Sequence, residues 1–550
     1  MRNKWTVLLL GLIILHLILV LYPAISMMYR GDGVEFIQCS KNVIKNGVPL
    51  YNHGQISTNR SCLWHPPLYI YVMSIFMFLF GENALATRLP SIILNVLSII
   101  FIYLIVIMLF KNSKEKHKIG LLASLLYAIN PITIQSSLVL DMEVLVSFIF
   151  LLSCYFYFKL DKKIYLLIPM VMLFWTKFAG AIILVGSFII FFLINKEWKQ
   201  LQRFIILTLS SLSLFLVSFF VWCKTLNLNF LMPFKHSSIL SSLFFIIQNP
   251  VLSVSKSLWA LKNFVYFATP FLILLFIFVI YEVIRHKELM DKKMYLFGII
   301  GVISIVFFGI TGSGSYNFPK YYIMALPSIC IFISSFIAKN KINLKFVDKR
   351  FVLTIGITSI LIILGFLIFL KDPIMPEISG TSASITLKEA AIKIIPHFMF
   401  YLLMPIILSS YLIFKLPKGK KIALTLLYLT LLVSCYINII QFSADYSTNY
   451  MYGDSNLGLS GTIAFLKDNN IPSESIAAYT HIGYYTNFEK FLDIILVYDS
   501  NELFQEWVVD NEKIKYVIVY EKDITRIDSS NWAEFELDRK IGDYYIFKKI

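Results

Sequence analysis

Ionisable side chains that could do chemistry gather at the ends of long apolar segments, while the middles of those segments carry no Asp, Glu, Lys or Arg. Carboxylates occur in two pairs, and cations occur nearby in other segments: Asp32 with Glu35, Asp141 with Glu143, and then Arg88, Lys177 and Lys320. A carboxylate can take the proton from an attacking hydroxyl group. Cations can stabilise a departing phosphate as its negative charge grows. The combination is typical of group transfer from a phosphate-bearing carrier.

Each of these side chains also has a purely structural interpretation. Asp32 and Asp141 could cap the helices that follow them, because Asp is a favoured helix cap. Lys177 and Lys320 could extend to lipid headgroups, and Arg88 could do the same. Glu35 and Glu143 could be solvated carboxylates. Both interpretations stay open at the level of sequence.

The composition predicts a membrane protein. Of 550 residues, 58% are hydrophobic and 15% are charged, whereas a soluble domain carries about 25% charged residues. Apolar runs long enough to cross a bilayer recur along the chain. We expect about 13 transmembrane helices near residues 5–26, 88–110, 119–138, 142–160, 164–177, 178–194, 203–222, 263–284, 294–310, 320–338, 351–370, 398–415 and 421–441.

The distribution of positive charge predicts the orientation of these helices, since cytoplasmic loops carry an excess of Lys and Arg. With a cytoplasmic N-terminus, every inner loop is basic: 111–118, 161–163, 195–203, 285–293, 339–350 and 415–421. The net charge of +16 therefore reflects membrane topology, and we expect no nucleic-acid partner. We predict a multi-pass protein of the cell membrane with its first helix retained rather than cleaved as a signal peptide.

Three regions are expected on the outer side. The loop 27–87 contains an amphipathic helix near 34–45 and an apolar stretch, 66–80, that is too short to span and is predicted to lie at the interface. The loop 223–262 is partly apolar. The segment 444–550 is polar and predicts a small extracytoplasmic α/β domain, with a helix at 460–467 and strands at 475–479, 515–520 and 544–548. Cys39 and Cys62 share the first loop, either as a disulfide or as free thiols.

Several motifs, in their order, resemble a known superfamily. They are the Asp32 loop, Trp64-His-Pro-Pro-Leu-Tyr69, Leu79-Phe-Gly-Glu-Asn83, Thr87-Arg-Leu-Pro-Ser91, the Asp141 segment, Thr176-Lys177, Pro319-Lys-Tyr-Tyr322 and Leu326-Pro327. Together they resemble the bacterial protein O-mannosyltransferase and aminoarabinose (lipid A) transferase superfamily over residues 1–340. Residues 444–550 are more loosely similar to the outer domain of some members.

The resemblance implies the C-type glycosyltransferase fold for residues 1–443, a polyprenyl-phosphate sugar donor, and a lipid, glycan or protein acceptor. By motif match, Asp32 would be the general base and Asp141 a second acidic residue of the site. Lys177 and Lys320 would approach the donor phosphate, and Arg88 would do so on the same reasoning.

The chain departs from the superfamily pattern at its acidic positions. Members often have Asp-Glu where this chain has Asp32-Gly33, with Glu35 two residues later, and Glu143 replaces a small residue or Pro. The acting carboxylate of each pair therefore stays open, as does a divalent cation, Mg²⁺ or Mn²⁺, held by two carboxylates and phosphate. A transporter or flippase of lipid-linked sugars is the alternative function, and a membrane scaffold is a third. A transporter predicts polar or charged groups along the spans, where almost none occur. A scaffold does not explain why carboxylates recur at the outer loops.

Overall fold

The computed structural model describes residues 2–29, 32–53, 56–236, 247–286, 290–311, 319–339, 418–443 and 458–550, with short gaps after 487, 494, 497, 524, 527 and 542. Contacts divide the chain into two compact units. The first contains Met1–Tyr22 and Arg88–Ser443, and the second contains Pro23–Thr87 and Ala444–Ile550. Residues 23–87, which the sequence assigns to the transmembrane part as an outer loop, therefore pack with the C-terminal segment.

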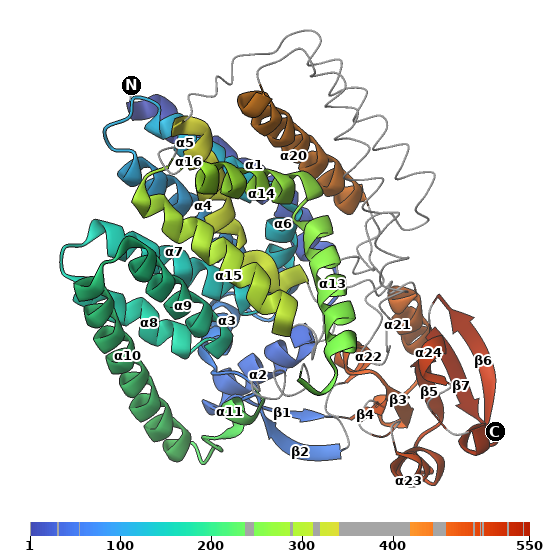
Figure 1. Cartoon of the computed structure of the whole chain (residues 1–550). Helices are drawn as coiled ribbons and strands as arrows, with labels where there is room; N and C mark the ends of the chain where they lie inside the picture. Colours follow the sequence, from blue (N-terminus) through green and yellow to red (C-terminus); the bar gives the residue numbers. More distant parts are fainter. Residues whose placement is uncertain are drawn as a thin grey trace. The chain divides into compact units, whose positions relative to one another are not determined.

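The first unit is helical in its described parts (Figure 1). Its α-helices are α1 (Arg2–Ser26), α4 (Ala84–Leu109), α5 (Lys116–Ala128), α6 (Pro131–Leu138), α7 (Glu143–Lys159), α8 (Leu167–Phe174), α9 (Phe178–Asn195), α10 (Trp198–Thr225), α11 (Met232–His236), α13 (Pro250–Phe267), α14 (Pro270–Arg285), α15 (Tyr295–Thr311), α16 (Leu326–Lys339) and α20 (Lys418–Ser443). Short 3₁₀ turns are η1 (Lys163–Leu166), η3 (Lys292–Met294) and η5 (Pro319–Met324).

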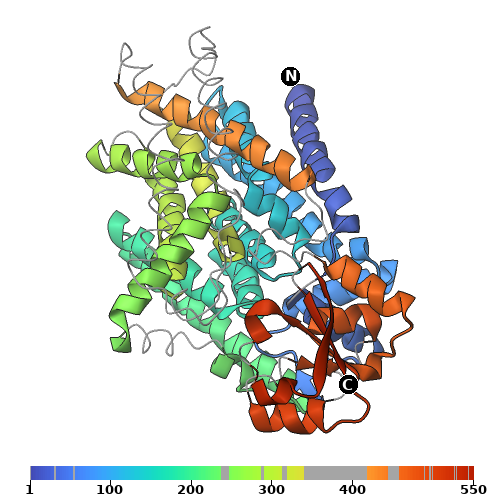
Figure 2. The ribbon, with the colours of Figure 1, turned by 90° about the vertical axis from the view of Figure 1, so that its right-hand side faces the viewer.

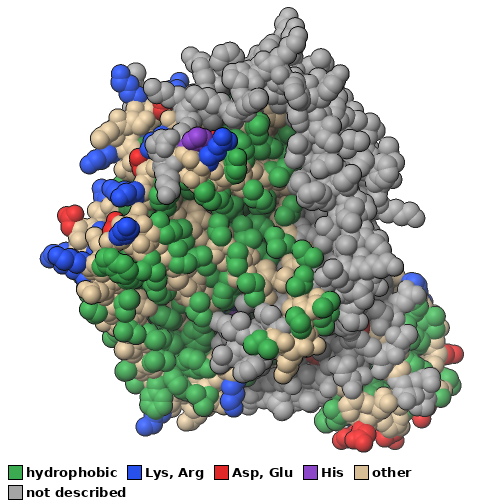
Figure 3. Space-filling view, in the orientation of Figure 1, with side chains coloured by type: hydrophobic (Ala, Val, Ile, Leu, Met, Phe, Trp, Pro, Cys, Tyr) green, Lys and Arg blue, Asp and Glu red, His purple; other side chains and the backbone are tan. Residues whose placement is uncertain are grey.

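Five described helices are long and apolar enough to cross a membrane, and a sixth span results if the bent pair α5–α6 is counted as one. The five are Lys4–Ser26, Ala84–Leu109, Phe178–Asn195, Trp198–Thr225 and Lys292–Ile310. The expected spans at 351–370 and 398–415 lie outside the described residues, and each of the others overlaps a described helix. Hydrophobic side chains cover most of the visible face of the first unit, and Lys and Arg gather at its upper left margin (Figure 3).

The segment expected as one span at 119–138 is broken, because α5 and α6 meet at an angle of 58°. Asn130 caps α6 by accepting from the backbone N–H of Ile132, and a proline follows at the first helical position, which is a strong start signal for a new helix. Asn95 of α4 stabilises the bend between α5 and α6 by two hydrogen bonds. It donates to Ser137 Oγ at 2.8 Å and accepts from Tyr127 Oη at 2.6 Å. These bonds join three helices at a point where backbone groups leave the regular helical pattern.

The loop expected at 223–262 is largely helical where it is described. It contains α11, and its last residues form most of α13, which ends at Phe267. The expected span at 263–284 is accordingly interrupted before α14 begins at Pro270. Thr269 at this joint has a φ of +70°, a region in which residues other than glycine are uncommon, and Asn130 donates to the neighbouring Ala268 carbonyl at 2.9 Å.

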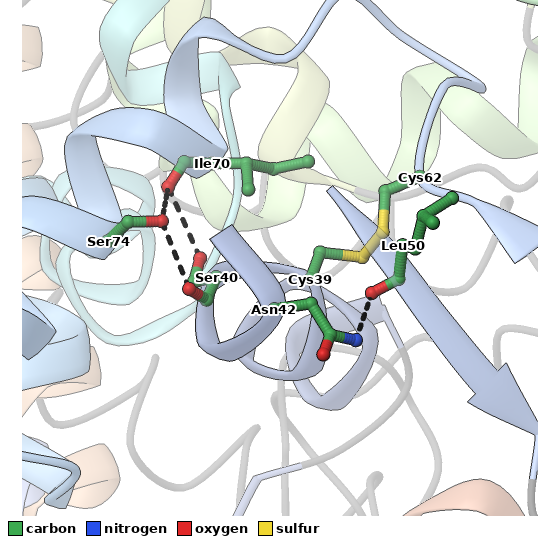
Figure 4. The surroundings of a disulfide bond; sticks show 7 residues. All are labelled: Cys39, Ser40, Asn42, Leu50, Cys62, Ile70 and Ser74. Atoms are coloured by element: carbon green, nitrogen blue, oxygen red, sulfur yellow. Dashed lines mark hydrogen bonds between the residues drawn. A yellow bond between two sulfur atoms is a disulfide. The ribbon is translucent and has the colours of Figure 1, made fainter. Parts of the chain in front are cut away.

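The first loop contributes two helices and a hairpin to the second unit: α2 (Asp32–Asn46), β1 (Leu50–His53), β2 (Ile56–Ser61) and α3 (Leu68–Phe80). The two helices agree with the expected segments near 34–45 and 66–80, whereas the antiparallel hairpin was not expected. Cys39 of α2 forms a disulfide with Cys62, just after β2 (Figure 4). Ser74 of α3 donates to the Ser40 carbonyl at 3.3 Å, which holds α3 against α2.

The C-terminal part of the second unit is an α/β fold, coloured orange-red to red in Figure 2. Its five-stranded sheet has the order β4-β3-β5-β7-β6. Its strands are β3 (Ile476–Ala478), β4 (Leu492–Asp493), β5 (Tyr516–Tyr520), β6 (Phe535–Ile541) and β7 (Tyr544–Lys549). Its helices and turns are α21 (Leu459–Asp468), η8 (Ser473–Ser475), α22 (Thr480–Thr486), α23 (Asn501–Phe504), η10 (Gln505–Val509), α24 (Glu521–Ile524) and η11 (Ser529–Trp532). Strands β3, β4 and β5 run parallel, and β7 is antiparallel to both of its neighbours, β5 and β6.

Candidate active site

Four charged side chains of the first unit form two ion pairs. Lys320 pairs with Asp141, and Lys177 pairs with Glu143. All four are buried, with exposed fractions between 1% and 6%. Burying an isolated charge is strongly unfavourable, so the carboxylates and ammonium groups have to lie together. The structure thus joins four residues from three separate segments of the sequence, 141–143, 177 and 320.

Three connections between helices position this cluster of four residues, which we call the charge cluster. Asp141 lies between α6 and α7, and its Oδ1 accepts from the Met142 N–H at 2.8 Å. Glu143 is the first residue of α7. Lys177 lies between α8 and α9, and Lys320 is in η5. The segments 139–142 and 175–177 are short, so the packing of the helices on either side sets where Asp141, Glu143 and Lys177 lie.

Side-chain contacts fix the connecting segments to α7. Ser147 of α7 donates to the carbonyl of Ile323 in η5 at 3.2 Å, which fastens the segment that carries Lys320. Gly180, three residues after Lys177, lets α9 approach α7: a Cβ there would lie 2.5 Å from Val146 Cγ1. Because such a distance is far inside van der Waals contact, glycine is required for this approach.

Both ammonium groups contact one aromatic ring. The ring centroid of Tyr321 is 4.6 Å from Lys177 Nζ and 5.6 Å from Lys320 Nζ, within the range of a cation–π contact. Burial is the largest cause that raises the pKa of Asp141, and the charge of Glu143 raises it further, while Lys320 opposes the shift.

Arg88 supports the cluster from α4. Its side chain is 1% exposed, and its Nε donates to the carbonyl of Leu138 at 2.8 Å. This carbonyl ends α6, three residues before Asp141. The observed contact therefore positions the Asp141 segment, and contact of Arg88 with a donor phosphate stays a prediction.

The other two predicted acidic residues belong to the second unit. Asp32 is the first residue of α2, but its side chain lies outside the described part of the chain. Glu35 follows on the same helix and is half-buried. The charge cluster thus consists of Asp141, Glu143, Lys177 and Lys320, all in the first unit. Asp32 and Glu35 belong to the second unit.

Sequence reasoning did not single out Ser147 or the ring of Tyr321 as parts of the site. A serine in an apolar helix gives no signal of its own, because its partner is a backbone carbonyl 176 residues away. Tyr321 stood within a recognised motif, next to Lys320. That position was the available signal, although it does not reveal that the ring also contacts Lys177.

Comparison with known proteins agrees with the resemblance inferred from the motifs. Residues 64–222 match the model of the dolichyl-phosphate-mannose-protein mannosyltransferase family. Three of the four residues in the charge cluster, Asp141, Glu143 and Lys177, fall within that segment. No curated protein matches the chain in sequence.

Two crystal structures of ArnT from Cupriavidus metallidurans are similar to the chain along its whole length. The structure with bound undecaprenyl phosphate has a TM-score of 0.60 at 12% identity and covers 100% of this chain and 99% of the other. The apo structure has a TM-score of 0.54 at 10% identity and covers 100% and 98%. The chain therefore has the fold seen in these ArnT structures, and the resemblance expected from the motifs is confirmed.

Proposed function

We propose that this protein is a membrane glycosyltransferase that moves a sugar from a polyprenyl-phosphate carrier to an acceptor at the outer face of the cell membrane. Asp32 is the proposed general base, and Asp141 is the second acidic residue of the site. The ArnT structure that shares the fold contains undecaprenyl phosphate, which is the class of carrier that the proposal requires. The acceptor is a lipid, a glycan or a protein.

The observation that carries the proposal is the buried charge cluster at the connections between helices. In the proposed reaction an acceptor hydroxyl attacks the anomeric carbon, the bond from that carbon to the phosphate oxygen breaks, and the proton passes to a carboxylate. The carrier leaves as a polyprenyl phosphate with one more negative charge. Lys177 and Lys320 bring two cations to one place, where low polarity strengthens their attraction for that charge.

The ion pairs are compatible with phosphate binding. A lysine ammonium has three N–H donors, so Lys177 can keep its bond to Glu143 and also donate to a phosphate oxygen. The carboxylates then hold the lysines in place before the donor arrives. The charge of the cluster is balanced in this state, and a phosphate adds the negative charge that the cations attract.

A divalent cation fits these residues poorly. The described part of the chain contains no group of three or more His, Cys, Asp or Glu side chains arranged to hold a metal ion. Mg²⁺ or Mn²⁺ at Asp141 and Glu143 would also lie next to two ammonium groups, which repel it. We therefore assign no step of the reaction to a metal.

The orientation is part of the proposal: the N-terminus is cytoplasmic, and residues 444–550 are extracytoplasmic. The basic loops support it through the excess of Lys and Arg expected inside. The disulfide between Cys39 and Cys62 supports it independently, because such bonds persist in oxidising compartments and are rare in the cytoplasm.

Asp32→Asn and Asp141→Asn test the proposal, with Asp161→Asn in the predicted inner loop as the matched control. Envelope lipids, glycans and proteins are compared by mass spectrometry in cells without the protein and in cells that express each variant. We expect the control to restore the sugar modification and both site variants to lose it when product is compared at equal protein levels in the membrane. Unchanged product with both site variants would refute the catalytic assignment and favour a transporter of lipid-linked sugars.

A further inference from the structure

Tyr29 connects distant segments within the second unit. It lies between α1 and α2, three residues before Asp32, and is 7% exposed. Its backbone N–H donates to Tyr485 Oη at 2.6 Å, and its own hydroxyl lies 2.6 Å from Thr87 Oγ1. The segment leading to Asp32 is thus bonded to the C-terminal domain and to the residue before Arg88.

The neighbouring tyrosine of α22 strengthens the same connection. The ring of Tyr484 meets the ring of Tyr29 edge to face, with centroids 5.4 Å apart. Its hydroxyl donates to Glu82 Oε1 at 3.2 Å, and Lys41 of α2 pairs with the same oxygen at 2.5 Å. Burial is the main cause that raises the pKa of Tyr484, so its phenol stays protonated and able to donate.

These contacts constrain the start of α2 in a specific way. Residues 27–29 have no regular secondary structure, so the N–H of Tyr29 has no place in a helical ladder. A buried backbone N–H is unfavourable without a partner, and the hydroxyl of Tyr485 supplies one from a residue 456 positions away. Met28 also packs on the core of the C-terminal domain. The direction in which the chain enters α2 is therefore set partly by that domain.

We propose that Tyr485 is a positioning residue for the transfer reaction. It holds the backbone of Tyr29 and thereby restricts how the chain enters α2, the helix whose first residue is Asp32. The C-terminal domain then contributes to the rate without contacting the reacting atoms. The inference rests on the proposed function and on Asp32 as the base.

Tyr485→Phe tests the proposal because it removes the hydroxyl and keeps the ring. The matched control is Tyr545→Phe, which removes a hydroxyl of the same domain that lies 2.6 Å from Lys540 Nζ. Full-length variants are purified in lipid nanodiscs, and hydrogen–deuterium exchange is followed in the peptide 27–33. We expect exchange there to rise about tenfold in Tyr485→Phe and to stay unchanged in the control, since one bond to a buried N–H is lost.

Product formation is then measured at equal protein levels, with binding of undecaprenyl phosphate and thermal unfolding as parallel readouts. We expect about tenfold less product for Tyr485→Phe, while binding and the unfolding temperature stay close to the parent values. If Tyr485→Phe shows the same hydrogen–deuterium exchange and the same product formation as the wild-type protein, the inference is overturned. Equal losses of product, binding and stability would also overturn it, because Tyr485 would then act only through folding.

Asp32→Asn separates this inference from the proposed function. If Asp32→Asn abolishes product and Tyr485→Phe behaves like the parent, the proposed function stands and the positioning role is wrong. If Asp32→Asn keeps full product, the general base has been misassigned, and the positioning role fails with it whatever Tyr485→Phe does to exchange.

Discussion

The pair of Lys177 and Glu143 predicts a non-additive pattern of stability. Both side chains are almost fully buried, at 6% and 1% exposed. Lys177→Met leaves the Glu143 carboxylate without its cation, and Glu143→Met leaves the Lys177 ammonium without its anion. Losing one partner of a buried pair destabilises a protein by about 3–5 kcal/mol, whereas replacing both partners by hydrophobic residues of similar volume is often close to neutral.

We therefore expect each single variant to lose about 3–5 kcal/mol and the double variant to recover most of that loss. The free energy of unfolding is measured by titrating dodecyl sulfate into mixed micelles, with helix content as the signal. Glycan product is measured in the same three variants. The double variant should regain stability without regaining product, because Lys177 is also proposed to contact the donor phosphate.

Two results would refute this reasoning. Single variants as stable as the parent protein would mean that the two charges are not buried together. A double variant that loses the sum of the single effects would mean that the charges do not interact. Recovery of both stability and product in the double variant would instead leave the ion pair intact as a structural feature and remove Lys177 from the proposed phosphate site.

Three further predictions follow from particular contacts. Gly180→Ala should reduce stability and product together, because the new Cβ would lie 2.5 Å from Val146 Cγ1. The control is Gly186→Ala, since nothing lies within 4 Å of a Cβ at that position. Equal stability of the two variants would contradict the close packing at Gly180. Removing the Cys39–Cys62 disulfide, which links residues 23 positions apart, should destabilise the second unit by about 3 kcal/mol. The loss would be measured as faster proteolysis of the loop 27–87. Unchanged proteolysis would argue against a stabilising role of the disulfide. Asn95→Leu should destabilise the first unit by about 2 kcal/mol through lost buried hydrogen bonds, measured by unfolding in mixed micelles, and parent stability would contradict this.

Much of the helical framework could be predicted because apolar length and loop charge are local properties. The helix at 66–80 was recognised as too short to span, and α3 occupies Leu68–Phe80. The break between α5 and α6 had a local signal, an asparagine followed by Pro131, that the hydropathy pattern masked. The hairpin β1–β2 was missed because Leu50–His53 and Ile56–Ser61 lack apolar alternation.

The candidate site was predictable in its residue types but not in its pairing. Sequence placed Asp141, Glu143, Lys177 and Lys320 at ends of helices, where water and headgroups were equally plausible surroundings. Their burial and the choice of partner depend on how four elements pack, which no local pattern encodes. The same holds for Tyr485, whose partner Tyr29 lies at the other end of the chain.

The composition of the second unit has a consequence for synthesis. Its two parts, Pro23–Thr87 and Ala444–Ile550, are separated by more than 350 residues, so at about 5–20 residues per second the ribosome needs roughly 20–70 seconds to pass from one to the other. During that interval the early part has to survive alone, without the tyrosines of α22. The Cys39–Cys62 crosslink needs only residues of the early part, and it can lock the nascent fragment into shape well before its late partner is translated.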